Sequence, residues 1–345
     1  MGSEAYANLW AVGVWRSGSA PAWGAGGRRF KSSHPDQSEP PSGTAASIHL
    51  IRIPADPNIG SLGPLLVSWH GFFTFLGVAA AIFLIARWAR REGLGSEAVY
   101  NVAIWAVLAG IVGARLVHVV DNWEFYQNDL PQILAINVGG VGLWGGLLGG
   151  LAGGIIAAWR MGYPILKMMD LSAPALIFSQ GIGRIGDVIN GEHCSKATDL
   201  PWGFVYTNPE SPAFSCTPLG GAGLTETHAM HPAVGYELIY DILAFGFLYK
   251  FVRGRIKPDG MLFVLYLAMY ATGRLLIQTF FRLDPKFIGS LQEAQVIAIS
   301  VLVVTGVVLL WKARPKTASD TGSAATFPQG PKLKGTRAER RRKDR

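Results

Sequence analysis

Long apolar stretches alternate with short polar loops over most of the chain. Because the hydrocarbon core of a bilayer is about 30 Å thick, a helix needs about 20 apolar residues to cross it. Seven stretches meet this requirement, and they run over Leu65–Ala86, Val99–Val120, Val141–Trp159, Met168–Gly186, Pro232–Tyr249, Met261–Phe281 and Ala294–Trp311. The pattern predicts an all-α, polytopic membrane protein with about seven transmembrane helices.

The basic residues divide unequally between the two sets of loops. The loops after the first, third and fifth stretches carry nine of them, namely Arg87, Arg90, Arg91, Arg160, Lys167, Lys250, Arg253, Arg255 and Lys257. The opposite loops carry three, Lys196, Arg282 and Lys286. Since positively charged loops stay in the cytoplasm, this distribution predicts an N-terminus outside and a cytoplasmic C-terminus.

The composition agrees with a membrane protein. Half of the 345 residues are hydrophobic and 16% are charged, against about 25% charged residues in soluble domains. This excludes an ordinary soluble enzyme, a coiled coil, a disulfide-stapled secreted domain and a disordered chain. The net charge of +8 lies in the loops and the tail, so it indicates contact with membrane lipid and no nucleic-acid partner.

The chain divides into three parts. Residues 1–47 are rich in Gly, Ser, Ala and Pro, and we expect a disordered extension or a wrongly assigned gene start. Residues 48–312 form the seven-helix domain, with a large outer loop over 187–231. Residues 313–345 end in a run of basic residues, and we expect a disordered cytoplasmic tail that is attracted to anionic lipid.

Polar and ionisable side chains of five predicted helices gather at one depth, in the outer half of the bilayer. Each charged group there costs at least about 2.5–3.5 kcal/mol, so each one needs a reason. Three are arginines and one is a clear carboxylate, and the set comprises His70, Arg115, His118, Arg184, Glu237, Tyr270 and Arg274, with Asp187 and Asn190 following at the surface. Arginine binds phosphate in a planar, bidentate manner. The excess of guanidinium groups therefore favours an anionic ligand, and a phospholipid headgroup is the nearest abundant anion.

Structural explanations of the same residues stay open. Arg184 and Asp187 are three positions apart on a helix, so they could simply neutralise each other, and Arg115 could extend to the outer headgroups. The third predicted helix carries glycine at every fourth position, as in Gly145, Gly149 and Gly153. Such stripes are typical of closely packed membrane helices.

Several motifs resemble those of the prolipoprotein diacylglyceryl transferase family. The segment 183–195 reads Gly-Arg-Ile-Gly-Asp-Val-Ile-Asn-Gly-Glu-His-Cys-Ser, and it is similar to the family signature Gly-Arg-x-Gly-Asn-Phe-x-Asn-x-Glu-x-x-Gly. In the family's order, the further matches are Ser68-Trp69-His70-Gly71, Gly113-Ala114-Arg115, Thr198-Asp199-Leu200-Pro201-Trp202-Gly203, His231-Pro232 with Tyr236-Glu237, and Tyr270-Ala271-Thr272-Gly273-Arg274 followed by Phe280-Phe281-Arg282. The resemblance covers residues 48–312.

The chain also departs from the family pattern. The departures are Asp187 for Asn, Val188 for Phe, Ser195 for Gly, His70 for Tyr, Trp144 for His, Gln278 for Glu, and one extra residue between Arg274 and Arg282. Because Trp144 replaces a histidine, the general base of the family does not carry over directly.

The resemblance implies a multi-pass enzyme of the bacterial cell membrane. Its partners are phosphatidylglycerol and a prolipoprotein signal peptide with a lipobox cysteine, and its reaction transfers the diacylglyceryl group to the cysteine thiol. We expect Arg184 and Arg274 to bind the phosphate and Tyr270 to orient it. We expect Asn190 and Glu192 to bind headgroup hydroxyls or fix the arginines, and the remaining substrate-binding candidates are Arg115, Asp187 and Glu237.

Three histidines are candidates for the base that activates the thiol, because histidine titrates near neutral pH. They are His70, His193 and His231, and His70 is preferred because it occupies a motif position. Each of them could also be structural. The spacing of His and Cys residues shows no closed set of metal ligands, and no cofactor is expected.

Three questions stay open from the sequence. Cys194 and Cys216 share the outer loop, where they could form a disulfide or remain free thiols, and Cys194 could instead be a reactive group.

Two other functions also fit the residues, a transporter of an anionic solute and a non-catalytic, lipid-binding relative of the enzyme.

Overall fold

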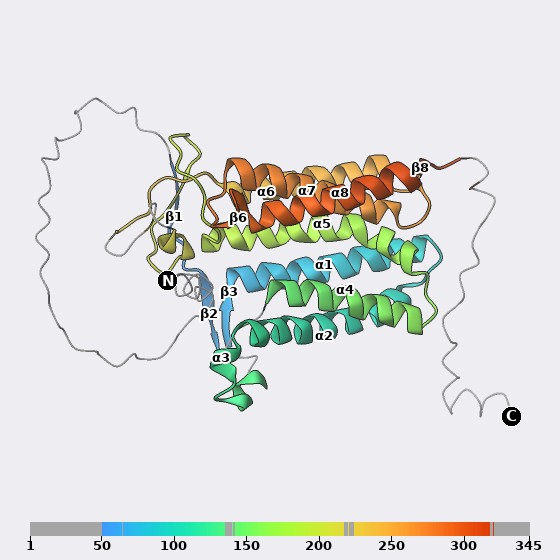
Figure 1. Cartoon of the computed structure of the whole chain (residues 1–345), viewed down its shortest axis with the longest axis horizontal. Helices are drawn as coiled ribbons and strands as arrows, with labels where there is room; N and C mark the ends of the chain where they lie inside the picture. Colours follow the sequence, from blue (N-terminus) through green and yellow to red (C-terminus); the bar gives the residue numbers. More distant parts are fainter. Residues whose placement is uncertain are drawn as a thin grey trace, which may run out of the picture.

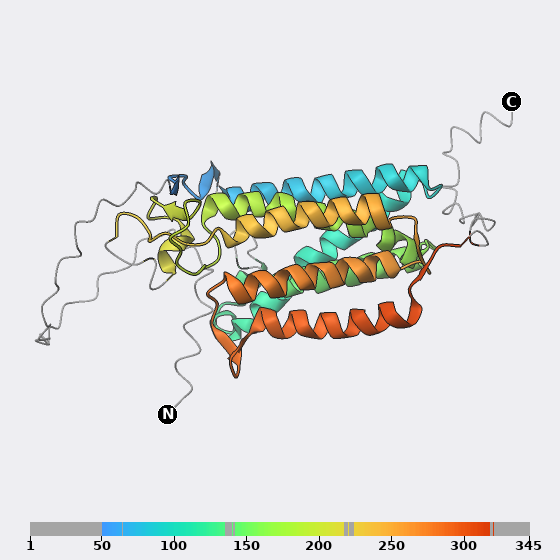
Figure 2. The same ribbon diagram turned by 90° about the horizontal axis from the view of Figure 1, so that it is seen from above.

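The computed structural model describes residues 50–317 and 320, apart from 64, 135–139, 141, 217–219 and 221–223. The predicted extension over 1–47 and nearly all of the predicted tail therefore lie outside the described residues. Within the described residues, seven helices of 15 residues or more form a bundle whose members run side by side (Figures 1 and 2). They are α1 Trp69–Arg91, α2 Ser96–Asp121, α4 Leu143–Arg160, α5 Ile165–Asn190, α6 Ala233–Phe247, α7 Met261–Phe280 and α8 Glu293–Lys312.

Each of these helices coincides with one of the seven predicted stretches, and their ends differ by up to five residues. The first helix begins at Trp69, because Leu65–Ser68 is strand β3, which pairs with β2 (Asn58–Leu62) in a hairpin. The Ser68 hydroxyl accepts a hydrogen bond from the Gly71 N–H at 3.1 Å and so caps α1. Helix α5 continues to Asn190, so the first residues of the predicted outer loop are helical.

Four of the helices, α1, α2, α7 and α8, are long and apolar enough to cross a membrane. Their outward faces carry large apolar side chains, of which Leu310 is 91% and Val120 is 72% exposed. An apolar surface of this extent is typical of helices that lie against lipid. The protein is therefore a mostly helical membrane protein.

The glycine stripe brings α2 and α4 into close contact. A Cβ atom on Gly145 would lie 2.0 Å from the carbonyl oxygen of Gly113, and one on Gly149 would lie 2.5 Å from that of Ala109. Only glycine allows backbones to approach so closely. The interpretation of the stripe as a packing surface is confirmed.

Helix α5 lies at the centre of the bundle, against α1, α6 and α7. A Cβ on Gly186 would lie 2.7 Å from the backbone of His70, so α1 and α5 touch where both carry candidate site residues. Gly181 faces the side chain of Asp241 on α6. Small residues on α5 thus determine how near the neighbouring helices come.

One end of the bundle, here called the capped end, carries most of the strands (Figure 1). Strand β1 (Ile51–Ile53) pairs in parallel with β4 (Phe204–Tyr206), and the 3₁₀ helix η4 (Pro212–Ser215) follows. Cys194 and Cys216 form a disulfide, so the structure selects the bridge among the alternatives. The remaining short elements there are α3 Trp123–Tyr126, η2 Leu130–Leu134, β6 Lys286–Ile288 and β7 Leu291–Gln292.

The opposite end, here called the turn end, is held by ion pairs. Glu92 binds Lys167 at 2.5 Å and Arg253 at 2.7 Å, and Arg253 lies over the ring of Trp88 at 4.4 Å. Helix α6 continues here into the π-helix η5 (Leu248–Val252), and β5 (Ile256–Lys257) pairs with β8 (Arg314–Pro315). These contacts connect α1, α5 and the end of α6.

Candidate functional site

A buried carboxylate on α6 binds three arginines near the capped end. The Glu237 side chain lies 2.8 Å from Arg184 of α5, 2.7 Å from Arg274 of α7 and 2.9 Å from Arg282, which follows α7. Glu237 is 5% exposed and Arg282 is fully buried. Charge-assisted contacts of this length are strong hydrogen bonds, so Glu237 fixes three guanidinium groups in one place.

A second buried carboxylate, Asp187, lies one turn after Arg184 on α5. It accepts a hydrogen bond from Arg184 at 2.8 Å and forms an ion pair with Nδ1 of His70, which α1 supplies. Arg184 therefore contacts Asp187 and Glu237 at once. The simple explanation, in which Arg184 and Asp187 only neutralise each other, is incomplete, because Arg184 connects α5 to α6.

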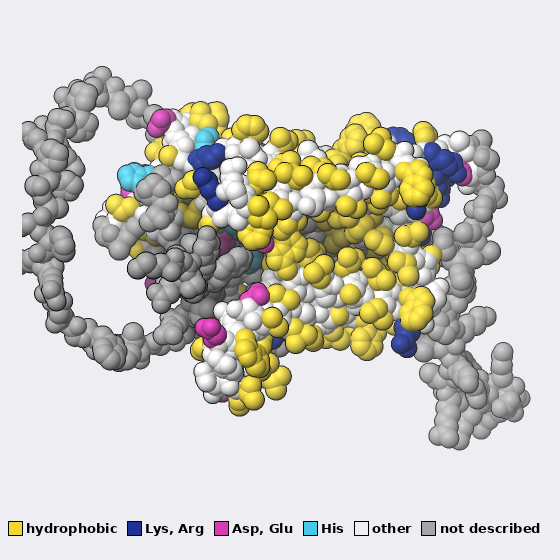
Figure 3. Space-filling view, in the orientation of Figure 1, with side chains coloured by type: hydrophobic (Ala, Val, Ile, Leu, Met, Phe, Trp, Pro, Cys, Tyr) yellow, Lys and Arg dark blue, Asp and Glu magenta, His cyan; other side chains and the backbone are white. Residues whose placement is uncertain are grey.

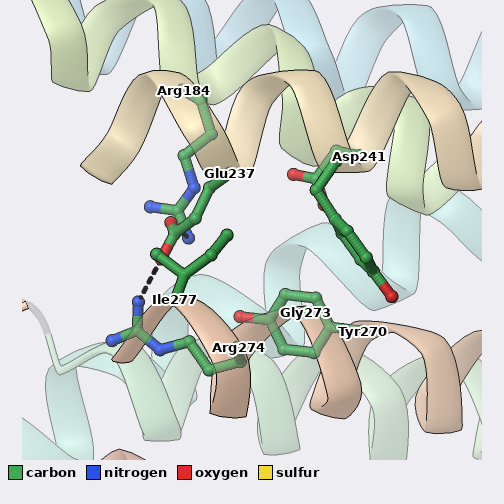
Figure 4. Close-up of a pocket in the computed structure, with 8 residues that line it drawn as sticks. Arg184, Glu237, Asp241, Tyr270, Gly273, Arg274 and Ile277 are labelled. Carbon is green, nitrogen blue, oxygen red and sulfur yellow. Dashed lines mark hydrogen bonds and ion pairs between the residues drawn. The ribbon is translucent and has the colours of Figure 1, made fainter. Parts of the chain in front are cut away.

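A pocket opens beside these charges, between α5, α6 and α7 (Figure 4). Eight residues line it, namely Arg184, Glu237, Tyr240, Asp241, Tyr270, Gly273, Arg274 and Ile277. Arg274 and Tyr270 are one turn apart on α7, as the sequence indicated, and both reach the pocket. The pocket therefore presents guanidinium groups and a phenol from separate helices, which suits an anionic ligand with hydroxyl groups.

The segment after α5 is held close to these charges. Gly191 ends the helix with φ of 78°, a conformation that favours glycine. The Ser211 hydroxyl donates to the Asn190 carbonyl at 2.6 Å, and the Asn190 amide donates to Glu192 at 3.3 Å. Burial raises the pKa of Glu192 above its usual value, although the Asn190 hydrogen bond opposes this.

The disulfide lies next to Arg282. The Leu283 N–H donates to the Cys194 carbonyl at 3.0 Å, and the Lys196 N–H donates to the Phe281 carbonyl at 2.8 Å. The two segments thus pair on either side of Arg282. Burial lowers the pKa of Arg282 to about 10 despite the charge of Glu237, so this guanidinium remains charged at neutral pH.

The three histidine candidates have different surroundings. His70 contacts Asp187, which orients its ring, and half of its side chain is exposed. Desolvation by the surrounding protein and the charges of Arg282 and Arg184 lower the pKa of His193 well below its usual value. His231 lies 3.5 Å from the Tyr236 hydroxyl, and burial followed by the charge of Lys196 lowers its pKa. His70 is the one whose ring a buried carboxylate holds.

Arg115 lies apart from the cluster around Glu237. Its guanidinium donates to the backbone carbonyls of Ile133, Gly140 and Gln132 at 2.5–2.8 Å, and it lies over the ring of Tyr126. Among the described residues it therefore holds the connection between α2 and α4.

Two residues enter the site that sequence reasoning did not place there. Arg282 was noted as part of a motif, but its position beyond the helix gave no reason to expect burial beside Glu237. Asp241 lies one turn after Glu237 on α6, and this spacing is the signal in the sequence that could have indicated a shared face. No group of three or more His, Cys, Asp or Glu side chains suited to a metal ion is found among the described residues.

Known proteins resemble this chain over most of its length. The family model described as "Prolipoprotein diacylglyceryl transferase" matches residues 57–312. A protein of Mycobacteroides abscessus named phosphatidylglycerol–prolipoprotein diacylglyceryl transferase is 30% identical, over 81% of this chain and 84% of its own. Proteins of the same name from Thermosynechococcus vestitus and Nostoc sp. are 32% and 30% identical, over 70% and 77% of this chain and 87% and 95% of their own.

Proposed function

Because the chain belongs to the prolipoprotein diacylglyceryl transferase family, we propose that it transfers the diacylglyceryl group of phosphatidylglycerol to the cysteine thiol of a prolipoprotein lipobox. The reaction forms a thioether and releases glycerol phosphate. The observation that supports it most is the set of three guanidinium groups around the buried carboxylate of Glu237, beside a pocket between the helices. An anionic lipid headgroup is the ligand that this charge and this depth favour.

The proposed chemistry uses groups from three helices. His70, oriented by Asp187, accepts the proton of the thiol, and the thiolate sulfur attacks the glyceryl carbon. The bond from that carbon to the phosphate oxygen breaks, and its electron pair stays on the leaving phosphate. Arg184 and Arg274 stabilise this growing charge, and His70 then releases its proton to water.

The remaining pocket residues position the lipid. Tyr270 lines the same pocket as Arg274 and orients the headgroup. Glu237 and Asp187 hold the arginines in place, and Asn190 with Glu192 contact headgroup hydroxyls at the capped end. Arg115 supports the adjacent α2–α4 connection, so its effect on lipid binding is indirect.

We also propose that all seven long helices cross the bacterial cell membrane, with the capped end outside. This is supported by the basic side chains, many of which gather at the turn end (Figure 3), because positive loops remain in the cytoplasm. Residues 48–312 then form the enzyme domain, between the extension over 1–47 and a cytoplasmic tail over 313–345.

A direct assay tests the function. Purified protein is incubated with phosphatidylglycerol and a lipobox peptide, and the peptide is weighed by mass spectrometry. A mass gain of one diacylglyceryl group supports the transferase. Solute uptake into vesicles without this gain indicates a transporter, and lipid binding with neither result indicates a non-catalytic relative.

Variants of the two arginines test the site. Arg184→Lys and Arg274→Lys keep the charge but lose the planar pair of donors, and we expect transfer to fall about 10²–10³-fold at unchanged expression. Arg160→Lys, at the far end of α4, is the matched control and keeps normal transfer. Normal turnover in both site variants would remove these arginines from the mechanism.

A further inference from the structure

The mechanism leaves one buried carboxylate of the pocket unused. Asp241 is 4% exposed and lines the pocket with Arg184 and Arg274. Figure 4 shows its carboxylate turned toward the side where Arg184 and Glu237 lie. Among the described residues it makes no hydrogen bond and no ion pair. A buried carboxylate without a partner is unfavourable, so its position needs a reason.

The charges around the pocket supply one. The cluster holds three guanidinium groups, with three positive charges, and two paired carboxylates, with two negative charges. Glu237 contacts all three arginines, and Asp187 contacts Arg184. One positive charge is left over when His70 is neutral. Asp241 lies one turn from Glu237 on α6, about 6 Å farther from the capped end, and its carboxylate interacts electrostatically with Arg184.

A bound phosphate diester would supply the same negative charge. With both anions present, the pocket would hold one negative charge in excess, in a region where water cannot screen it. Protonation of the unpaired carboxylate removes this excess. Glu237 and Asp187 are poor candidates for that proton, because each is held by direct ion pairs.

We propose that Asp241 is a proton-exchanging counter-charge of the anion site, ionised in the empty pocket and protonated when a lipid phosphate binds beside the arginines. The proton comes from water and returns to water when the phosphate leaves. The choice of a lipid phosphate rests on the proposed function; the exchange of charge requires only an anion in the pocket.

Other groups around the pocket bear on the proton count. Arg184 lines it from α5, Glu237 and Tyr240 from α6, and Tyr270 and Arg274 from α7. Asp187 of α5 pairs with Arg184, and His70 of α1 pairs with Asp187. Arg282, Glu192 and His193 lie at the capped end. Arginine and tyrosine side chains ordinarily titrate far from neutral pH, whereas histidine titrates close to it. His70 is the group that could imitate the effect, so it needs its own control.

Binding measured against pH tests the proposal. The probe is a short-chain, ether-linked phosphatidylglycerol, a phosphodiester whose own charge is constant, and the full-length protein is held in neutral detergent. Linkage requires that uptake of one proton weakens binding about tenfold per pH unit where Asp241 is ionised in the free protein. We expect this slope in the wild-type protein on the alkaline side of neutral pH, and a flatter dependence in acid, where the free protein already carries this proton.

Matched variants identify the group responsible. Asp241→Asn should lose the tenfold change in lipid affinity per pH unit, and at high pH it should bind the lipid more tightly than wild type does. Asp241→Glu should keep the pH dependence. His70→Asn should also keep it. A slope that is unchanged in Asp241→Asn, or lost in His70→Asn, would overturn the proposal, and so would a wild-type affinity that does not change with pH.

A measurement on the wild-type protein alone covers the case in which Asp241→Asn does not fold. The ether-linked lipid has no ester carbonyl, so the infrared difference spectrum on binding reports protein carboxyl groups. We expect a new band of a protonated carboxylic acid that shifts in heavy water, and its absence overturns the proposal. Because neither readout needs transfer, a failed transfer assay with a positive band counts against the proposed function only.

Discussion

Replacing Glu237 by Gln tests whether one carboxylate holds the three arginines together. Gln has the same shape as Glu but no charge, and its amide N–H groups would face guanidinium donors. Glu237 is 5% exposed, and its contacts with Arg184, Arg274 and Arg282 are 2.7–2.9 Å long. Removing one partner of a buried ion pair typically costs about 3–5 kcal/mol.

We therefore expect Glu237→Gln to lower the free energy of unfolding by about 3–5 kcal/mol, which is about a 10²–10⁴-fold change in the folded-to-unfolded ratio. The assay is thermal and denaturant unfolding of the purified protein in detergent at neutral pH. Glu226→Gln is the matched control, because the exposed pair of Glu226 with Arg52 contributes at most about 1 kcal/mol.

A double variant gives a stricter test of the same reasoning. Arg282 is fully buried, and two of its nitrogen atoms have no hydrogen-bond partner among the described residues. If its charge is unfavourable without Glu237, Glu237→Gln with Arg282→Met should be more stable than Glu237→Gln alone. The reasoning is refuted if Glu237→Gln unfolds like the Glu226→Gln control, or if the second substitution adds its full cost without any recovery.

Two further predictions concern stability away from the site. Burial alone would raise the pKa of Glu92, but the hydrogen bonds and charges of Lys167 and Arg253 have the larger combined effect. The pKa of Glu92 therefore lies below its usual value. The ion pairs therefore stabilise the fold above the unfolded-state pKa, and the stabilisation is lost as pH falls through the folded-state pKa. Glu92→Gln should be about 1 kcal/mol less stable than wild type at pH 7 and equal to it in strong acid, as followed by melting temperature against pH. Gly145→Ala places a methyl group 2.0 Å from a carbonyl oxygen of α2, so it should lower the melting temperature. Gly246→Ala is the control, because its methyl group meets nothing within 4 Å, and it should leave the melting temperature unchanged or raise it slightly. Equal melting temperatures for these two variants would contradict the packing argument.

Much of the fold could be predicted from hydropathy and glycine spacing. Apolar stretches of membrane length must form helices, because a bilayer offers no other partners for backbone N–H and C=O groups. The glycine stripe at Gly145 and Gly149 predicts a close contact, and the structure places α2 there. The start of the first helix was predicted four residues too early, since an apolar strand such as Leu65–Ser68 has no periodicity that separates it from a buried helix segment.

The sequence by itself determined the membrane class and the family, and it indicated that arginines from separate helices gather at one level along the bundle, because these depend on local composition, order and spacing. Which charges meet is decided only by the tertiary structure. Arg115 and Arg184 look equivalent along the chain, yet one binds backbone carbonyls and the other binds Glu237. Through the packing of α5, α6 and α7, Arg282 likewise joins the cluster around Glu237, and Asp241 joins the pocket. The physical reason is that the energy of a buried charge depends on the partners within a few ångströms of it, and helix packing brings those partners from distant parts of the sequence.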